Sequence, residues 1–263
     1  MELYTFQSNG TSVTTQSGGN FFSGSLIMGG SSTALNGNLP RFGSRPATNA
    51  IGYMFMAGAN IYTVGAGSSV GGWLPFGILS SNYTPTIAPI NNTGAPITGW
   101  SDLYYDYDNA LALTNSGRVF SVGLLNATNV WTEVAIPNGA FITKIFGPQS
   151  RGSNQNVVSY YAIDTNGKLY AWGNNAWGQL GLNNTTNQAA PQIVTALSSK
   201  VIVDVSVTGN NGITVIALDS TGQIYTWGFD GQGGAYNGSV IGDGSGGVNV
   251  LTPYTVTGMS NQV

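Results

Sequence analysis

Short runs of apolar and aromatic residues recur along this chain, and glycine-rich turns separate them. In Leu169–Gly173 the side chains of an extended backbone would point alternately to opposite faces, and Gly173 opens a turn rich in Gly and Asn that ends at Leu180 and Gly181. The same pattern returns almost unchanged at Ile224–Gly228. The recurrence predicts a short β-strand followed by a tight turn, used as a repeating unit.

Weaker copies of this strand precede the two clear ones. Val119–Gly123, Ile61–Gly65 and Leu3–Phe6 place apolar and aromatic residues in the same slots. Together the copies recur at intervals of roughly 50 to 60 residues, a period that is typical of β-propeller blades joined by loops of varying length. About five repeats are therefore visible.

Other recurring patterns surround the repeated strand and complete the unit. An apolar strand with a polar turn that closes on Gly comes directly before it, which predicts a β-hairpin. This pattern is found at Ala110–Gly117, Tyr161–Gly167 and Ile216–Gly222. After the repeated strand, Pro191–Val194 and Pro253–Val256 predict an edge strand, where the missing N–H of Pro costs little. Ile142–Ile145 and Val201–Val205 supply opening strands, so each unit predicts a four-stranded sheet.

The order of strand, turn, Gly, Tyr-x-Trp-Gly, Asn, Gly-Gln-Leu-Gly and Pro-x-x-Val resembles the repeat of the regulator of chromosome condensation family, the RCC1-type β-propeller. The resemblance is specific at Gly167–Val194, good at Gly222–Val256, moderate at Gly117–Gly123 and weak before residue 66. It implies an all-β fold built of RCC1-like four-stranded blades, although members of the family usually form seven-bladed rings. We expect a single domain over residues 1–263, in which residues 1–50 form a degenerate first blade or an N-terminal arm.

The register of the repeats predicts an open ring. The chain begins at the Tyr-Trp strand with Leu3–Phe6 and stops soon after the Pro strand, at Val263. Joining the two ends would leave one blade without its two inner strands, and an open propeller exposes strand edges that invite pairing. We therefore expect that the chain continues beyond residue 263, that another chain completes the ring, or that residues 10–50 supply the missing strands.

The composition excludes several classes of function. Charged residues make up only 6% of the chain, and the seven Lys and Arg residues are scattered, which argues against nucleic-acid binding. The chain contains no Cys and no His, so thiol nucleophiles, imidazole bases and the usual zinc ligands are excluded. No stretch is long enough to span a membrane, and the starting Met is not followed by a signal peptide.

One acidic cluster and one glycine-rich loop could suggest chemistry. Asp106 and Asp108 lie two residues apart and would share a face of a strand, so they could bind a hard cation or serve as an acid and base pair in a hydrolase or lyase. The repeat instead places Asp102–Asp108 on an inner strand or in the turn before it. The loop Gly242–Gly247 lacks the strand before and the helix after that a phosphate-binding loop requires, which indicates an expanded inter-strand loop. We predict no cofactor, no metal and no enzymatic activity.

The aromatic residues divide into two groups. Those of the repeated strand, among them Trp172 and Trp227, recur with the period and are predicted to pack between blades. Trp73 and Phe76 lie in an apolar connection before residue 100, and Trp177 lies in the variable part of a turn. These three are the candidate contact residues.

Uncharged polar surfaces are typical of virion, fibre and secreted surface proteins. We therefore predict a non-enzymatic structural or recognition protein on a particle surface, a bacteriophage virion component such as a fibre, spike or capsid decoration, that assembles through propeller edges and loops. Its partners would be other virion subunits, copies of itself, or a host surface protein or glycan. The alternative is a secreted propeller that binds a protein or glycan. The nucleotide-exchange and chromatin roles implied by the resemblance depend on charged, His-containing loops and a basic tail, which are not found here.

Overall fold

The computed structural model describes residues 41–42, 52–57, 60–65, 82–87, 97, 99–105, 109–123, 128–148, 158–208, 213–231, 241–244 and 247–257. Several predictions fall on other residues and lie outside the described part of the chain. These are the strand Leu3–Phe6, most of the arm or degenerate blade of residues 1–50, the pair Asp106 and Asp108, and the candidate contact residues Trp73 and Phe76.

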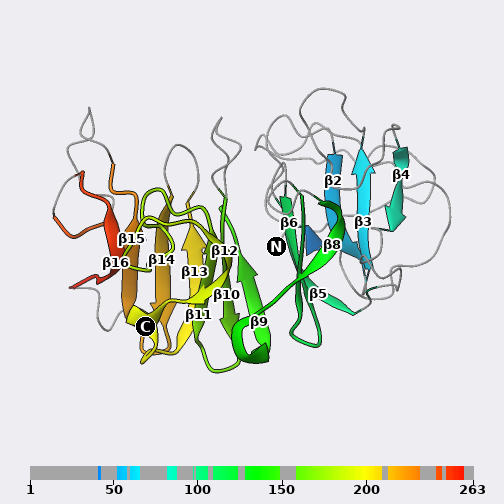
Figure 1. The fold of residues 1–263 in the computed structure, drawn as a ribbon. Coiled ribbons are helices and arrows are strands. Elements are labelled where there is room, and N and C mark those ends of the chain that lie inside the picture. Colours follow the sequence, from blue (N-terminus) through cyan, green and yellow to red (C-terminus); the bar gives the residue numbers. More distant parts are fainter. Residues whose placement is uncertain are drawn as a thin grey trace, which may run out of the picture.

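The described strands form four antiparallel sheets, each made of four strands that are consecutive in the chain (Figure 1). The first sheet contains β1 (Arg41–Phe42), β2 (Gly52–Ala57), β3 (Asn60–Gly65) and β4 (Asn82–Ile87). The second contains β5 (Trp100–Tyr105), β6 (Asn109–Thr114), β7 (Val119–Gly123) and β8 (Thr128–Val134). The third contains β9 (Ile142–Phe146), β10 (Ser159–Asp164), β11 (Leu169–Gly173) and β12 (Gln188–Ile193). The fourth contains β13 (Ile202–Val207), β14 (Thr214–Asp219), β15 (Ile224–Gly228) and β16 (Val250–Thr255).

Two short 3-10 helices are found among the described residues, η2 (Pro137–Gly139) between β8 and β9, and η3 (Thr195–Leu197) between β12 and β13. Among the described residues, no helix is both long and apolar enough to cross a membrane.

The predicted four-strand unit is confirmed in each sheet, including the hairpin between its second and third strands. The hairpin register is the same throughout: Asn109 pairs with Gly123, Ser159 with Gly173, and Thr214 with Gly228. This shared register makes positions in different sheets directly comparable. Of the acidic cluster Asp102–Asp108, Asp102 belongs to the first strand of its sheet, β5, and Asp106 and Asp108 lie outside the described residues.

Each sheet stacks face to face on the next, and the alternation along the strands supplies the apolar layers between them. Tyr170 and Trp172 point toward the second sheet, where they pack with Leu111. Leu169 and Ala171, one residue out of phase, pack with the fourth sheet instead. Because successive side chains of a strand point to opposite faces, a single strand contributes to two layers. The prediction that the recurring aromatics pack between blades is thus confirmed.

The hairpin turns are held by a polar residue at the end of the second strand. In the third sheet the Asp164 carboxylate accepts hydrogen bonds from the backbone N–H of Asn166 (2.8 Å) and Lys168 (2.9 Å) and from the hydroxyl of Tyr170 (3.2 Å). In the fourth sheet Asp219 accepts the equivalent bond from the Tyr225 hydroxyl at 3.0 Å. Each carboxylate therefore joins its own turn to its own sheet.

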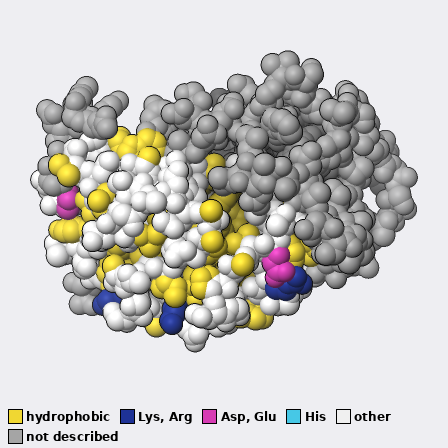
Figure 2. Space-filling view, viewed as in Figure 1, with side chains coloured by type: hydrophobic (Ala, Val, Ile, Leu, Met, Phe, Trp, Pro, Cys, Tyr) yellow, Lys and Arg dark blue, Asp and Glu magenta, His cyan; other side chains and the backbone are white. Residues whose placement is uncertain are grey.

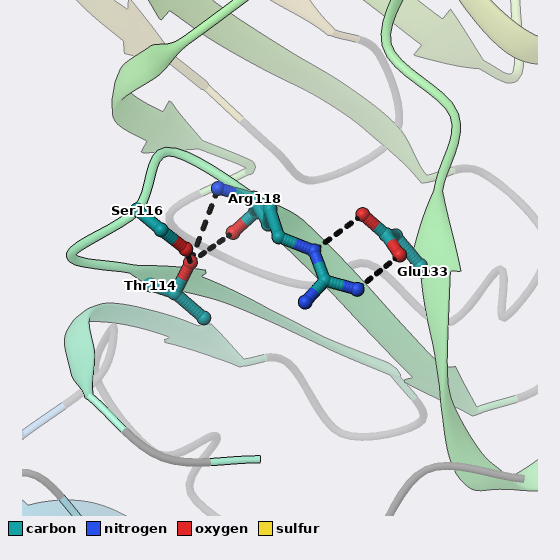
Figure 3. Close-up of polar contacts among 4 residues, drawn as sticks. All are labelled: Thr114, Ser116, Arg118 and Glu133. Carbon is teal, nitrogen blue, oxygen red and sulfur yellow. Dashed lines mark hydrogen bonds and ion pairs between the residues drawn. The ribbon is translucent and has the colours of Figure 1, made fainter. Parts of the chain in front are cut away.

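The second sheet closes its hairpin turn without a carboxylate (Figure 3). Thr114 occupies the position of the aspartate, and its hydroxyl accepts the backbone N–H of Arg118 at 3.1 Å. Phe120 occupies the position of the tyrosine and has no hydroxyl to donate. The second sheet therefore lacks both the aspartate carboxylate and the tyrosine hydroxyl that donates to it in the other two sheets. On the surface, Arg118 forms a two-point ion pair with Glu133 of β8.

The four described sheets lie in a row, with the first and the last at opposite ends (Figure 1). Arg41–Phe42 is the opening strand of the first sheet, so part of residues 1–50 contributes to the sheet that contains Ile61–Gly65. The described residues form four of the roughly five repeats predicted, and they do not show ring closure.

Candidate functional site

The loops between the third and fourth strands gather at one end of the sheets, which we call the loop end. The hairpins lie at the opposite end, the hairpin end, because neighbouring strands are antiparallel. Two loop-end segments are described, residues 174–187 between β11 and β12, and parts of residues 229–249 between β15 and β16.

The fully buried side chain of Asn175 holds the 174–187 loop in shape. Its amide nitrogen donates to the backbone carbonyl of Asn184 (2.8 Å), and its amide oxygen accepts the backbone N–H of Leu180 (2.9 Å). The backbone N–H of Asn175 donates to the side chain of Asn187 at 2.8 Å. A short polar side chain thereby replaces the backbone ladder that an irregular loop lacks.

Gln179 connects this loop to the neighbouring sheet. Its backbone carbonyl accepts two hydrogen bonds, from the hydroxyl of Tyr161 in the same sheet (2.6 Å) and from the indole N–H of Trp227 in the fourth sheet (2.7 Å). Nearby, the backbone N–H of Asn183 donates to the carbonyl of Leu251 on β16 at 3.0 Å. The 174–187 loop is therefore part of the junction between the third and fourth sheets.

Gly178 shows how closely the loop approaches the fourth sheet. Its φ is +73°, and a Cβ atom there would lie 2.3 Å from Cδ2 and 2.9 Å from Cα of Leu251. Only glycine combines this backbone conformation with this contact.

Trp177, the candidate contact residue in this loop, is half-buried. Its backbone N–H donates to the side-chain oxygen of Gln179 (2.9 Å), and its ring meets the ring of Phe229 edge to face, with centroids 5.8 Å apart. The loop thus presents part of a large aromatic ring to solvent on a backbone that is already fixed. Such a residue can contact a partner at a small entropic cost.

Asp230 has the same role in the 229–249 loop that Asn175 has in the 174–187 loop. Its side chain is fully buried, and its carboxylate accepts the backbone N–H groups of Ile241 (2.9 Å) and Gly247 (3.3 Å). Sequence reasoning missed Asn175, Gln179 and Asp230. The available signal was positional, because Asn175 and Asp230 are each the second residue after a Trp-Gly pair.

Three titratable groups at the hairpin end have shifted pKa values with clear causes, Tyr170, Asp219 and Glu133. Burial, the negative charge of Asp164 and the hydrogen bond to its carboxylate together raise the pKa of Tyr170 to about 12. Burial also acts to raise the pKa of Asp219, but hydrogen bonds from Thr221, Gln223 and Tyr225 outweigh it and leave that pKa lowered. The hydrogen bond to Arg118 lowers the pKa of Glu133. These groups stabilise hairpin turns and the surface of the sheets.

Ionic side chains are sparse on the face shown in Figure 2, and the visible Lys and Arg side chains lie along its lower edge. Among the described residues no cluster of three or more acidic side chains could hold a metal ion. The described part of the 174–187 loop therefore offers aromatic, amide and backbone groups for contact.

Comparisons with known proteins agree with this architecture. The family model described as "Regulator of chromosome condensation (RCC1) repeat" matches residues 166–213. The human E3 ubiquitin-protein ligase HERC2 is 29% identical over 124 residues, which is 45% of this chain and 2% of that protein. The Protein RCC2 homolog of Danio rerio is 35% identical over 94 residues, 36% of this chain and 17% of that protein. The chain thus spans a small part of these relatives' lengths.

A solved structure extends the match beyond the repeat that the family model covers. The crystal structure of human WBSCR16 superimposes with a TM-score of 0.53 at 16% identity, covering 79% of this chain and 50% of that one. At this identity the likeness concerns the fold.

Proposed function

Because this chain is built from RCC1-like β-propeller repeats, we propose that it is a non-enzymatic protein-binding module that contacts its partner through the loop end of the third and fourth sheets. The observation that carries the proposal is Trp177, a half-exposed indole on a loop whose backbone is fixed by buried amides.

Protein interfaces concentrate their binding energy in a few large, rigid side chains, and Trp is enriched among them. Trp177 already leans on Phe229, so little rotational freedom remains to be lost on binding. The hairpin end has a different task, because its polar side chains are committed to closing turns. Because the polar side chains of the hairpin end close turns while Trp177 is partly exposed at the loop end, the loop end is the better candidate for a contact surface.

The partner should be recognised through apolar and uncharged polar contacts. The chain has few charged residues, and Arg118 is already paired with Glu133 at the hairpin end. Affinity should therefore depend weakly on salt, unlike the affinity of a basic protein for nucleic acid.

The test compares the two ends of the same sheet. A tagged full-length chain is used to recover bound proteins from its source, and the recovered amounts are quantified by mass spectrometry for the wild type, Trp177→Ala and Asn166→Ala. Asn166 is an exposed residue of the β10–β11 hairpin and serves as the matched control. Trp177→Ala should lower recovery of the specific partner at least tenfold while Asn166→Ala leaves it unchanged. Equal recovery with both variants would refute a contact surface at Trp177.

The finer assignment, a bacteriophage virion component on a particle surface, stays a prediction that rests on the uncharged polar composition. The relatives described above carry names of a ubiquitin ligase and of an RCC2 protein, which give this assignment no support. The secreted propeller that binds a host protein or glycan stays a prediction as well. Co-purification of the chain with intact particles would support the first, and binding of isolated chain to glycans or host proteins would support the second.

A further inference from the structure

The turn between the second and third sheets has a sequence and surroundings that favour a reaction of the backbone with its own side chain. This turn is η2, whose residues Pro137, Asn138 and Gly139 lie between the ladders of β8 and β9. Asn138 has φ 59° and ψ 16°, and Gly139 has φ 61°. Asn followed by Gly takes up such left-handed backbone readily, and both residues are exposed to solvent.

The residues on either side anchor this turn, whereas its tip has few contacts. Ile136 and Ala140 pack against the apolar layer between the second and third sheets. At the tip, the Gly139 N–H donates to the carbonyl of Ile136 at 3.1 Å, and the Ala140 N–H donates to the carbonyl of Pro137 at a long 3.4 Å. Apart from its chain neighbours, nothing in the described part of the chain lies within 4 Å of the position that a Cβ on Gly139 would take. The backbone of Gly139 is therefore open to water.

A second Asn-Gly pair in the described chain provides an internal comparison. Asn166 and Gly167 close the hairpin between β10 and β11, and Asn166 is exposed. Gly167, in contrast, is buried, and a Cβ there would lie 2.6 Å from Cγ1 of Val201. The Asp164 carboxylate accepts the N–H of Asn166 at 2.8 Å, and the Asp164 carbonyl accepts the N–H of Gly167 at 3.0 Å. The same dipeptide is thus held firmly in this turn and accessible in η2.

We propose that Asn138 is a site of spontaneous deamidation in the folded chain. The backbone nitrogen of Gly139 attacks the side-chain carbonyl carbon of Asn138 and forms a five-membered succinimide ring. The bond from that carbon to the amide nitrogen breaks, and the amide leaves as ammonia with the proton of the Gly139 N–H. Water then breaks either carbon–nitrogen bond of the ring and leaves aspartate or isoaspartate. Glycine favours the attack because no side chain shields its nitrogen.

The conformation of each turn decides how easily the ring closes. The reacting atoms belong to neighbouring residues, so the reaction is intramolecular once they are aligned. With ψ at 16°, the Cα–C bond of Asn138 must rotate before the nitrogen reaches the carbonyl carbon. In η2 this rotation breaks the two turn hydrogen bonds and no strand pairing. At Asn166 the same reaction would break the bonds to Asp164 and move Gly167 from beneath Val201. Local opening therefore costs less in η2, and Asn138 reacts first.

The reaction changes both the charge and the backbone at the junction of two sheets. Either product adds one negative charge to a chain whose formal net charge is −3. Isoaspartate also lengthens the main chain by one CH2 group between positions 138 and 139. Because Ile136 and Ala140 on the two sides pack into the apolar layer, the longer backbone should disturb that packing. Isoaspartate should therefore lower the melting temperature more than aspartate does, with Asn138→Asp as the reference.

Peptide mapping of the full chain measures both turns in one experiment. Trypsin cleaves after Lys and Arg, so Asn138 falls in residues 119–144 and Asn166 in residues 152–168. The folded chain is incubated at mildly alkaline pH, and fragment spectra locate each replacement of NH2 by OH. Isoaspartate is quantified by methyl transfer from S-adenosylmethionine with a purified isoaspartyl methyltransferase. Asn138 should react at least about tenfold faster than Asn166 in the folded chain. In urea the two should react at similar rates, because the fold no longer distinguishes them.

Matched variants assign the signal to the turn. Glutamine would have to close a six-membered ring, which forms far more slowly, so Asn138→Gln should remove the isoaspartate from residues 119–144. Asn166→Gln changes the equivalent position of the other turn and should leave that signal unchanged. Equal conversion at the two sites in the folded chain, or faster conversion at Asn166, would overturn the proposal. So would an unmodified Asn138 after an incubation in which the urea-unfolded chain has reacted.

Discussion

The third and fourth sheets share their strand register and their hairpin and loop hydrogen bonds, but they differ in how their two faces are covered. Both close their hairpins with an aspartate that accepts a tyrosine hydroxyl, and both anchor the following loop on a buried polar residue, Asn175 or Asp230. The third sheet is covered on both faces, whereas the fourth is covered on one, as the exposure of Ile216 shows. The hairpin polar contacts are therefore properties of one sheet, while burial of the faces depends on the neighbour.

The largest contrast is expected at equivalent apolar positions. Leu169→Ala should lower the free energy of unfolding by about 2–5 kcal/mol, because it opens a cavity between two sheets. Ile224→Ala, at the matching position of the half-buried face, should cost about 1 kcal/mol in dilute protein. Urea unfolding monitored by Trp fluorescence measures both. Equal losses in dilute solution would mean that the two faces are covered alike.

The next largest effect concerns the two loop anchors. Asn175→Ala should cost about 2–3 kcal/mol, because the buried N–H of Leu180 and the carbonyl of Asn184 lose their partner. Asp230→Asn keeps the shape and one acceptor oxygen, as Asn175 itself demonstrates, and should cost about 1 kcal/mol or less. Thermal unfolding followed by circular dichroism compares the two. A larger loss for Asp230→Asn would show that the carboxylate charge itself is required.

Much of this architecture could be predicted from the sequence, because strands and hairpins leave local patterns. The apolar strand and turn at Tyr161–Gly167 sufficed to place β10, and the repeated strand at Leu169–Gly173 sufficed to place β11. The loop anchors could not be predicted, since the bonds of Asn175 and Gln179 depend on groups brought close by folding, such as Trp227 of another sheet. The exposure of Ile216 could not be predicted either, because the residues around it have the pattern of a buried strand.

A smaller effect follows from the lowered pKa of Asp219. A carboxyl whose pKa is lower in the folded than in the unfolded chain stabilises the fold when ionised, so its contribution is present above the ordinary Asp pKa of about 4 and is lost as pH falls through the folded pKa. The wild type should therefore lose stability on acidification below about pH 4. Asp219→Asn should be less stable at neutral pH and lose less on acidification. Melting temperatures at several pH values decide this, and parallel curves for both proteins would contradict it.

The smallest effect is expected for the ion pair between Arg118 and Glu133 in the second sheet. Both side chains are exposed, with 53% and 45% of their surfaces accessible. Exposed pairs contribute about 0.2–1 kcal/mol, and salt screens them. Arg118→Ala and Glu133→Ala should each change the free energy of unfolding by less than about 1 kcal/mol, and a double-mutant cycle should show a coupling that fades in high salt. A larger, salt-independent coupling would assign this pair a structural role.

The 174–187 loop is a fixed part of the junction between two sheets and therefore holds Trp177 in place for contact. Hydrogen–deuterium exchange of the full chain tests whether the loop is fixed. The backbone amides of Leu180 and Asn183, bonded to Asn175 and Leu251, should exchange as slowly as that of Ala171 in the middle of β11. Exchange of these loop amides within seconds, while Ala171 remains protected, would contradict the claim.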